Sequence, residues 1–180
     1  AYEKEVTMER LHDRMKELFG SESDDLMLLD QFDNFQPEDP HNLKSANPSK
    51  LALYQDPLLG IFDGQFAGKG LREHYRELAD KLEVCLKKEM PKRTGNLLAY
   101  YQKLAAFLAE KAEMGLEINS AYDNEAQERP RQWADKRIPE CLEMLEELRE
   151  RREALWMEEC RPQGYEVLDI RLGGVRNRLD

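Results

Sequence analysis

Apolar side chains recur at helical spacing through the second half of the chain, and this pattern limits the fold more than any other feature. Steps of three and four residues place side chains on one face of a helix. Three segments show such a stripe: Leu71, Tyr75, Leu78, Leu82 and Cys85; Leu97, Tyr101, Leu104, Leu108 and Ala112; and Ala134, Ile138, Cys141, Leu145, Leu148 and Leu155. Helices that are apolar on one face bury it against one another. We therefore predict an all-α fold, an antiparallel bundle of about three long helices.

Short breaks separate the predicted long helices. The first helix is expected to end near Met90-Pro91, and the second to begin after a turn at Thr94-Gly95. Pro139 either kinks the third helix or lies in its restarted first turn. Before the bundle, residues 5–20 carry a further apolar stripe that ends at Gly20, which predicts a shorter N-terminal helix.

The C-terminal segment is expected to leave the bundle. Pro162 and Gly164 predict a turn, and the alternation of residue types within 165–170 is typical of an extended segment. Gly173-Gly174 then precedes a short helical piece. The prediction is an extended C-terminal tail that places apolar side chains on a neighbouring surface.

The charge balance narrows the classes of partner. The chain has 37 acidic and 27 basic residues, a net charge of −10, whereas nucleic acids and anionic membranes both require a basic face. No apolar run approaches the roughly 18 residues of a membrane span, and the N-terminus lacks a signal-peptide core. The odd number of cysteines and the absence of a C-x-x-C pair favour reduced thiols. We expect a cytoplasmic protein that binds neither nucleic acid nor membrane.

Motifs for metals, phosphates and nucleophilic catalysis are missing. His12, His41 and His74 are isolated from one another, and no H-E-x-x-H pair occurs. The glycines around Lys69 do not have the phosphate-binding spacing G-x-x-x-x-G-K-[ST], and no G-x-S-x-G sequence is present. We predict no metal site and no cofactor.

The stretch 47–60, NPSKLALYQDPLLG, contains the first candidate binding residues. If residues 51–54 are extended, Tyr54 and Asp56 point to the same side, because side chains alternate along a strand. A phenol next to a carboxylate can hydrogen-bond neighbouring hydroxyls or an amide oxygen. In the alternative, Asp56 caps a helical turn that begins at Pro57-Leu58, with Tyr54 packed beneath it.

Trp156 and Glu159 form the second candidate. A tryptophan can stack on a sugar ring or pack in the seam between helices. Trp156 directly follows Leu155 of the apolar stripe, which favours the seam, and both interpretations stay open from the pattern alone.

Two separate stretches resemble a known family. Residues 47–63, with NPSK and LYQDPLLGIFD, and residues 155–174, with LW and RPQGYEVLDIRLGG, resemble the C-terminal part of a bacterial subgroup of family 20 glycoside hydrolases, the exo-β-N-acetylhexosaminidases. The resemblance implies a parent enzyme in which a (β/α)₈ catalytic barrel is followed by a helical domain. In this family the substrate's own acetamide oxygen attacks C1, assisted by an adjacent Asp-Glu pair.

The resemblance also implies roles for particular residues. Tyr54 would donate a hydrogen bond to the acetamide oxygen and Asp56 would hold sugar hydroxyls, while Trp156 and Glu159 would complete the pocket. The Asp-Glu dipeptide does not occur in this chain, so no catalytic residue is predicted and the chain alone is expected to be inactive.

The implied organisation divides the chain in two. Residues 1–63 would be the closing segment of the barrel, and residues 64–180 the helical bundle domain. The expected partners are the enzyme's own catalytic barrel and a glycan with a terminal N-acetylhexosamine, and a homodimer is left open. The alternative is a free-standing helical interaction module, without enzymatic activity, that binds a protein through its apolar tail 165–175.

Overall fold

A computed structural model describes residues 6–20, 23–34, 47–123 and 131–180 of the chain. No strand occurs within these ranges, so the predicted all-α class is confirmed. The elements in chain order are α1 (Met8–Phe19), α2 (Ser23–Met27), the 3₁₀ turn η1 (Leu28–Phe32), α3 (Pro48–Tyr54), α4 (Asp63–Phe66), α5 (Leu71–Cys85), α6 (Lys92–Lys111), α7 (Met114–Asp123), the π-helical turn η2 (Trp133–Arg137), α9 (Ile138–Glu159) and α10 (Tyr165–Leu179).

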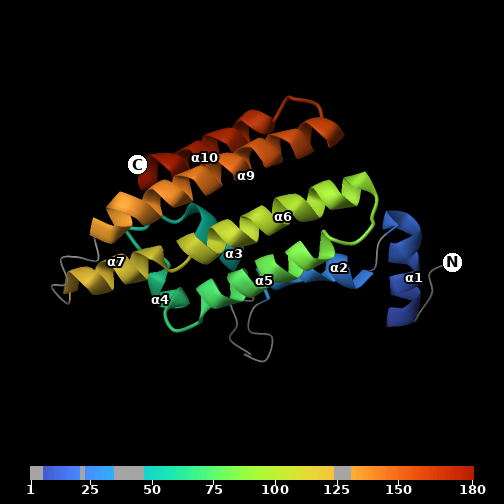
Figure 1. The fold of residues 1–180 in the computed structure, drawn as a ribbon, viewed down its shortest axis with the longest axis horizontal. Helices are drawn as coiled ribbons and strands as arrows, with labels where there is room; N and C mark the ends of the chain where they lie inside the picture. Colours follow the sequence, from blue (N-terminus) through green and yellow to red (C-terminus); the bar gives the residue numbers. More distant parts are fainter. Residues whose placement is uncertain (1–5, 21–22, 35–46, 124–130) are drawn as a thin grey trace.

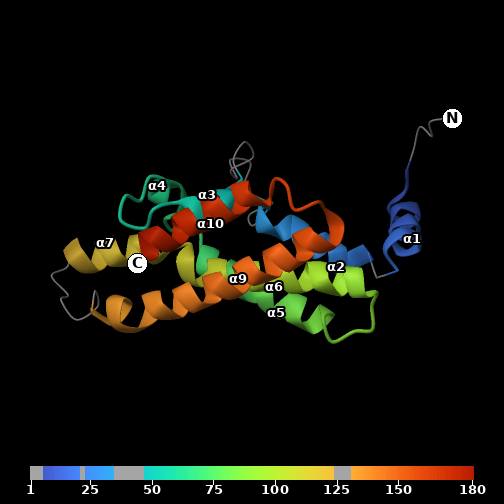
Figure 2. The ribbon, with the colours of Figure 1, turned by 90° about the horizontal axis from the view of Figure 1, so that it is seen from above.

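The long helices form the predicted bundle. Helix α6 is central and packs against α5 and α9, and each of the three runs opposite to the one before it (Figures 1 and 2). Pro139 lies in the first turn of α9, where its missing N–H has no helical partner to lose. The second helix begins at Lys92, before the expected turn at Thr94-Gly95, because Pro91 already serves as its N-cap.

The extended C-terminal tail is a wrong prediction. Residues 165–179 form helix α10, which packs on α9 and α3 (Figure 2). Tyr165, Leu172 and Val175 are buried, and Leu168 is half-buried. These positions follow steps of three, four and three residues, which is a helical stripe. The tail therefore completes the bundle and does not leave it.

The expected extended piece at residues 51–54 is also wrong. Pro48 occupies the first turn of α3, where the fixed φ angle of proline favours a helix. Helix α3 ends at Tyr54, and Gln55 has extended backbone angles, φ −63° and ψ 139°. Asp56 precedes Pro57, and residues before a proline disfavour the helical conformation. Helix α3 buries Ala52 and Leu53 against the bundle.

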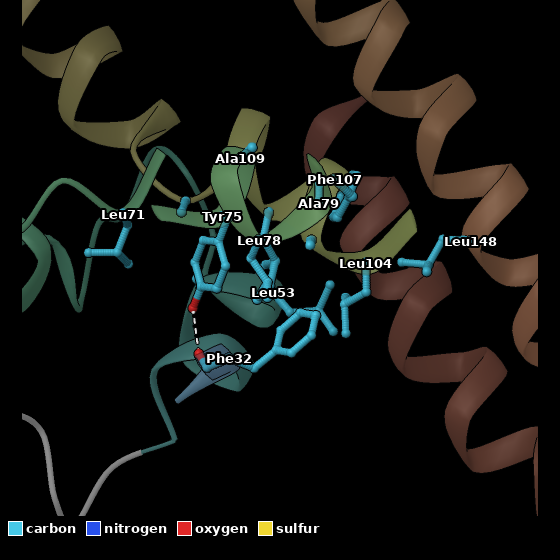
Figure 3. Close-up of a cluster of buried hydrophobic side chains, with 14 of the residues drawn as sticks. Phe32, Leu53, Leu71, Tyr75, Leu78, Ala79, Leu104, Phe107, Ala109 and Leu148 are labelled. Carbon is cyan, nitrogen blue, oxygen red and sulfur yellow. Dashed lines mark hydrogen bonds between the residues drawn. The ribbon is translucent and has the colours of Figure 1, made fainter. Parts of the chain in front are cut away.

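One core runs through both halves of the chain. Phe32 and Leu53 lie in the same buried cluster as side chains of α5 and α6 (Figure 3). The hydroxyl of Tyr75 donates to the backbone oxygen of Phe32 at 3.0 Å, which joins η1 to α5. The predicted division between residues 63 and 64 stays a prediction, and the packed core crosses it.

Helix α1 differs from the rest of the fold. The predicted N-terminal helix is present, yet it buries none of its side chains. It lies at one end of the molecule, beside α2 (Figure 1). Among the described helices, none combines the length and the apolar character that crossing a bilayer requires.

Candidate functional site

The four predicted site residues lie at the ends of two helices. Tyr54 is the last residue of α3, and Asp56 follows it in the next turn. Trp156 and Glu159 are in the final turn of α9. The structure brings Tyr54 close to the Trp156 region and directs the carboxylate of Asp56 elsewhere.

Tyr54 lies on a hollow of about 310 Å³, here called the Tyr54 hollow. Its wall includes three tyrosines, one from α3 and two from α6, together with Lys50 and Arg152. Tyr100 and Tyr101 pack edge to face, with ring centroids 5.1 Å apart. Burial raises the pKa of Tyr100 to about 12. Burial also raises the pKa of Tyr54, and the positive charges of Arg171 and Arg152 oppose that rise.

Trp156 and Glu159 line a second hollow of about 250 Å³, here called the Trp156 hollow. Arg152 borders both hollows. Its guanidinium lies 5.3 Å from the ring centroid of Tyr100 and 5.9 Å from that of Trp156. The two hollows therefore share a cationic wall, and residues of α3 and α9 that are about a hundred positions apart in sequence border one region.

Both predicted residues of the Trp156 hollow already have partners. The indole N–H of Trp156 donates to the backbone oxygen of Arg161 at 2.8 Å, and its ring is half-buried rather than part of the core. Glu159 accepts two hydrogen bonds from Arg93. Hydrogen bonding by Arg93 lowers the pKa of Glu159.

Asp56 caps the turn that follows α3. Its Oδ1 accepts from the backbone nitrogens of Leu58 at 2.9 Å and Leu59 at 3.1 Å. Its Oδ2 lies 3.6 Å from Nε of Arg178 on α10. The alternative prediction, that Asp56 caps a turn at Pro57-Leu58, is confirmed. A contact of Asp56 with sugar hydroxyls stays a prediction.

A buried polar network supports this turn from below. Lys111 is 3% exposed, and its Nζ donates to the backbone oxygens of Ala52 at 2.9 Å and Gln55 at 2.8 Å. These carbonyls lie at the C-terminal end of α3, where a helix leaves acceptors unsatisfied and favours a cation. The Gln55 side chain donates to Asp63 at 2.7 Å and accepts from the backbone of Phe62 at 2.9 Å. Burial lowers the pKa of Lys111 to about 8.

Sequence reasoning missed the residues that complete these sites. Arg152 is four positions before Trp156, about one helical turn away. This spacing places the two side chains on the same face of a helix and could have identified Arg152. The adjacent pair Tyr100-Tyr101 was a second signal, because two neighbouring positions of a helix point in different directions and only Tyr101 belongs to the apolar stripe. Lys111 gave no signal, since its partners are backbone oxygens.

Gly115 and Gly173 provide a matched test of how closely the turn approaches α7. A Cβ on Gly115 would lie 2.5 Å from the backbone oxygen of Pro57, whereas outside its own helix no described residue lies within 4 Å of a Cβ on Gly173. Gly115→Ala is expected to lower the free energy of unfolding by about 2 kcal/mol, because the backbone must move. Gly173→Ala is expected to raise it by about 0.5–1 kcal/mol, since alanine is favoured inside helices. Urea unfolding followed by circular dichroism measures both, and a stabilised Gly115→Ala variant would contradict the close approach.

A larger hollow, of about 600 Å³, lies between α7 and η2 and contains none of the predicted site residues. Arg137 covers the ring of Trp133 at 3.6 Å. The same guanidinium donates to Glu110 and Glu117, at 2.8 Å each. The positive charge of Arg137 is thus paired within the fold. In the part of the chain that the structure describes, no group of three or more histidine, cysteine or acidic side chains could hold a metal ion.

Comparison with known proteins identifies the family. The family model described as the Glycoside Hydrolase 20C C-terminal domain matches residues 24–180. This range contains the Tyr54 hollow, the capped turn and all of the Trp156 hollow except Phe19, and it leaves out α1. No curated protein was found to match the chain. The resemblance seen in residues 47–63 and 155–174 is confirmed at the level of the family, and the chain belongs to the Glycoside Hydrolase 20C C-terminal domains.

Proposed function

We propose that this chain is the helical scaffold of a β-N-acetylhexosaminidase and that it supplies Tyr54 to the recognition of the N-acetyl group. One observation supports the proposal most strongly. The hydroxyl of Tyr54 has no hydrogen-bond partner among the described residues, although its ring is half-buried on the wall of the Tyr54 hollow. The hydroxyl is not among the buried side-chain atoms that lack a partner in the described chain, so it reaches solvent and is available to a ligand.

The chemistry of the family gives that hydroxyl a task. In substrate-assisted hydrolysis the acetamide oxygen of the sugar attacks C1, and negative charge moves away from that oxygen as the ring forms. A phenol that hydrogen-bonds the oxygen orients it for attack. The catalytic domain would supply the Asp-Glu pair, which this chain lacks. The chain alone is therefore expected to be inactive on aryl N-acetylhexosaminides.

The other three predicted residues would act less directly. Trp156 keeps part of its ring exposed beside the Arg152 wall and would contact the sugar or its aglycone. The carboxylate of Asp56 is engaged in capping, which supports a positioning role for the segment that carries Tyr54. Glu159 is held by Arg93 and keeps acceptor positions through which it would bind a hydroxyl. Tyr54 is thus the residue on which the proposal depends.

The test uses the full-length enzyme that carries this domain. Tyr54→Phe is expected to reduce kcat/KM on p-nitrophenyl N-acetyl-β-D-glucosaminide by about 10²-fold, because misplacement of a reacting group costs about this much. The matched control is Tyr122→Phe, which removes a hydroxyl from a tyrosine that is 80% exposed on α7. The control is expected to keep full activity.

Thermal unfolding distinguishes a lost contact from a damaged fold. The hydroxyl of Tyr54 makes no hydrogen bond within the described chain, so Tyr54→Phe is expected to leave the Tm of the 180-residue chain unchanged. A loss of activity below about threefold would remove Tyr54 from the sugar site, since the loss of a group that orients the attacking oxygen is expected to cost far more.

A further inference from the structure

The segment between α3 and α4, residues 57–62, exposes three aliphatic side chains side by side in sequence. Leu58 is 68% exposed, Leu59 71% and Ile61 73%. The six residues PLLGIF carry no charge, in a chain of which 36% of residues are charged. Single exposed apolar side chains are ordinary on a protein surface, whereas three within four residues are typical of an interaction site. We call this segment the 57–62 loop.

The 57–62 loop is held in one conformation by hydrogen bonds on both sides. Asp56 binds the backbone nitrogens of Leu58 and Leu59 through its side chain, and that of Gly60, at 3.1 Å, through its backbone oxygen. Gly60 has φ +54°, a left-handed conformation that favours glycine. Pro57, the first residue of the loop, is buried.

The buried network of Gln55, Asp63 and Lys111 fixes the base of the same loop. Gln55 binds both the backbone of Phe62 and the carboxylate of Asp63, and Lys111 holds the carbonyl of Gln55. A loose loop could fold its apolar side chains toward the core and remove them from water. This loop is fastened with the three aliphatic side chains facing outward, so their exposure is part of the fold.

We propose that the 57–62 loop is the surface by which this domain packs on the catalytic domain of its own polypeptide; the inference rests on the proposed function. The occupant follows from two observations. The loop lies inside the matched range 24–180 of a family defined as a C-terminal domain, and such a domain follows another on the same polypeptide. An uncharged apolar centre with polar groups such as Arg178 at its edge matches the anatomy of an interface.

The alternative occupant, a second copy of the chain, is disfavoured by charge. Each copy carries a net charge of −10, and like-charged molecules repel as they approach. Helix α1 also exposes apolar side chains, but it lies outside the range that the family shares. The 57–62 loop is therefore the better candidate for a contact that belongs to the domain as such.

Thiol labelling tests the contact in the assembled enzyme. Ile61→Cys is made in a Cys160→Ser background, because Cys160 is exposed whereas Cys85 and Cys141 are buried. The rate of reaction with a maleimide is measured in the full-length enzyme and in the 180-residue chain. We expect the full-length enzyme to react at least tenfold more slowly at this position. Val84→Cys, on a side chain that is 58% exposed on α5, is the matched control and is expected to react equally in both.

Three results would overturn the proposal. Equal labelling of Ile61→Cys in the two proteins would show that the catalytic domain does not cover the loop. If labelling slows equally at Ile61→Cys and Val84→Cys, the protection is not specific to the 57–62 loop. Protection that appears in the 180-residue chain alone as its concentration rises would assign the loop to a second copy. Labelling is independent of the sugar site, so an active Tyr54→Phe enzyme with a protected Ile61→Cys would reject the role of Tyr54 and keep the docking surface.

Discussion

Replacement of Lys111 by methionine is expected to lower the free energy of unfolding by about 3 kcal/mol at pH 7, because two carbonyls that are buried in the fold lose their donor. Those carbonyls belong to Ala52 and Gln55, at the end of α3. Methionine keeps the length of the side chain, so the loss reports the hydrogen bonds more than a cavity. Urea unfolding of the 180-residue chain measures the change.

Lys103→Met is the control for Lys111→Met. Lys103 is on the same helix, α6, but its ammonium makes a surface ion pair with Glu147 at 2.6 Å. Such pairs contribute less than about 1 kcal/mol. Equal destabilisation by the two substitutions would contradict a special role for the buried amine.

The same residue gives stability a characteristic dependence on pH. Burial lowers the pKa of Lys111 from 10.5 to about 8 in the folded chain. Between these two values the unfolded chain binds more protons than the folded chain. The free energy of unfolding therefore rises with pH through this window, and it falls again as the pH is lowered toward 8. From pH 7 to pH 9 the free energy of unfolding is expected to rise by about 1 kcal/mol.

The gain is best measured as the difference between the natural chain and Lys111→Met. Burial raises the pKa of both Cys85 and Cys141 to about 11, and this acts in the opposite direction at alkaline pH. The thiols are common to both proteins, so their effect largely cancels in the difference. We expect the stability advantage of the natural chain to widen from pH 7 to pH 9, and parallel curves would show that the amine does not titrate in this range.

Phe107→Ala is expected to lower the free energy of unfolding by about 4 kcal/mol, because the substitution removes a large side chain from a packed core and leaves a cavity. Phe107 is on the central helix α6 and is fully buried (Figure 3). Tyr122→Ala removes an aromatic ring of similar size that is 80% exposed, and it is expected to change stability by less than about 0.5 kcal/mol. A loss below about 2 kcal/mol for Phe107→Ala would mean that the neighbouring helices collapse into the space.

The bundle could be predicted from the sequence because each long helix carries its own stripe. Helix α10 was missed although Tyr165, Leu168, Leu172 and Val175 have the same spacing. The alternation of residue types within 165–170 favoured an extended segment instead, and the two glycines 173 and 174 lower helix propensity by about 1 kcal/mol each. Burial of one face of α10 against α9 and α3 outweighs that cost, as packing commonly does for helices.

The candidate site was less accessible to sequence reasoning. The Asp-Pro step predicted the capped turn, because the signal is local. The shared wall of the two hollows depends on Arg152 of α9 lying beside Tyr54 of α3 and Tyr100 of α6, and no spacing within one helix encodes that arrangement. Lys111 binds backbone oxygens, which every residue possesses, so its partners cannot be read from residue types.

The hydrogen bonds from Lys111 to the end of α3 also bear on when, during folding, the 57–62 loop reaches its final structure. The lysine and the carbonyl of Gln55 are 56 positions apart, and contacts of such long sequence separation form late because a large loop must first close. The cap by Asp56 is local, but the carbonyl of Gln55 at the base of the 57–62 loop gains its donor only when α6 packs against α3. Under the docking proposed above, a partly folded domain would present its neighbour with a loop whose base is not yet fastened, and joining of the two domains would await closure of the bundle.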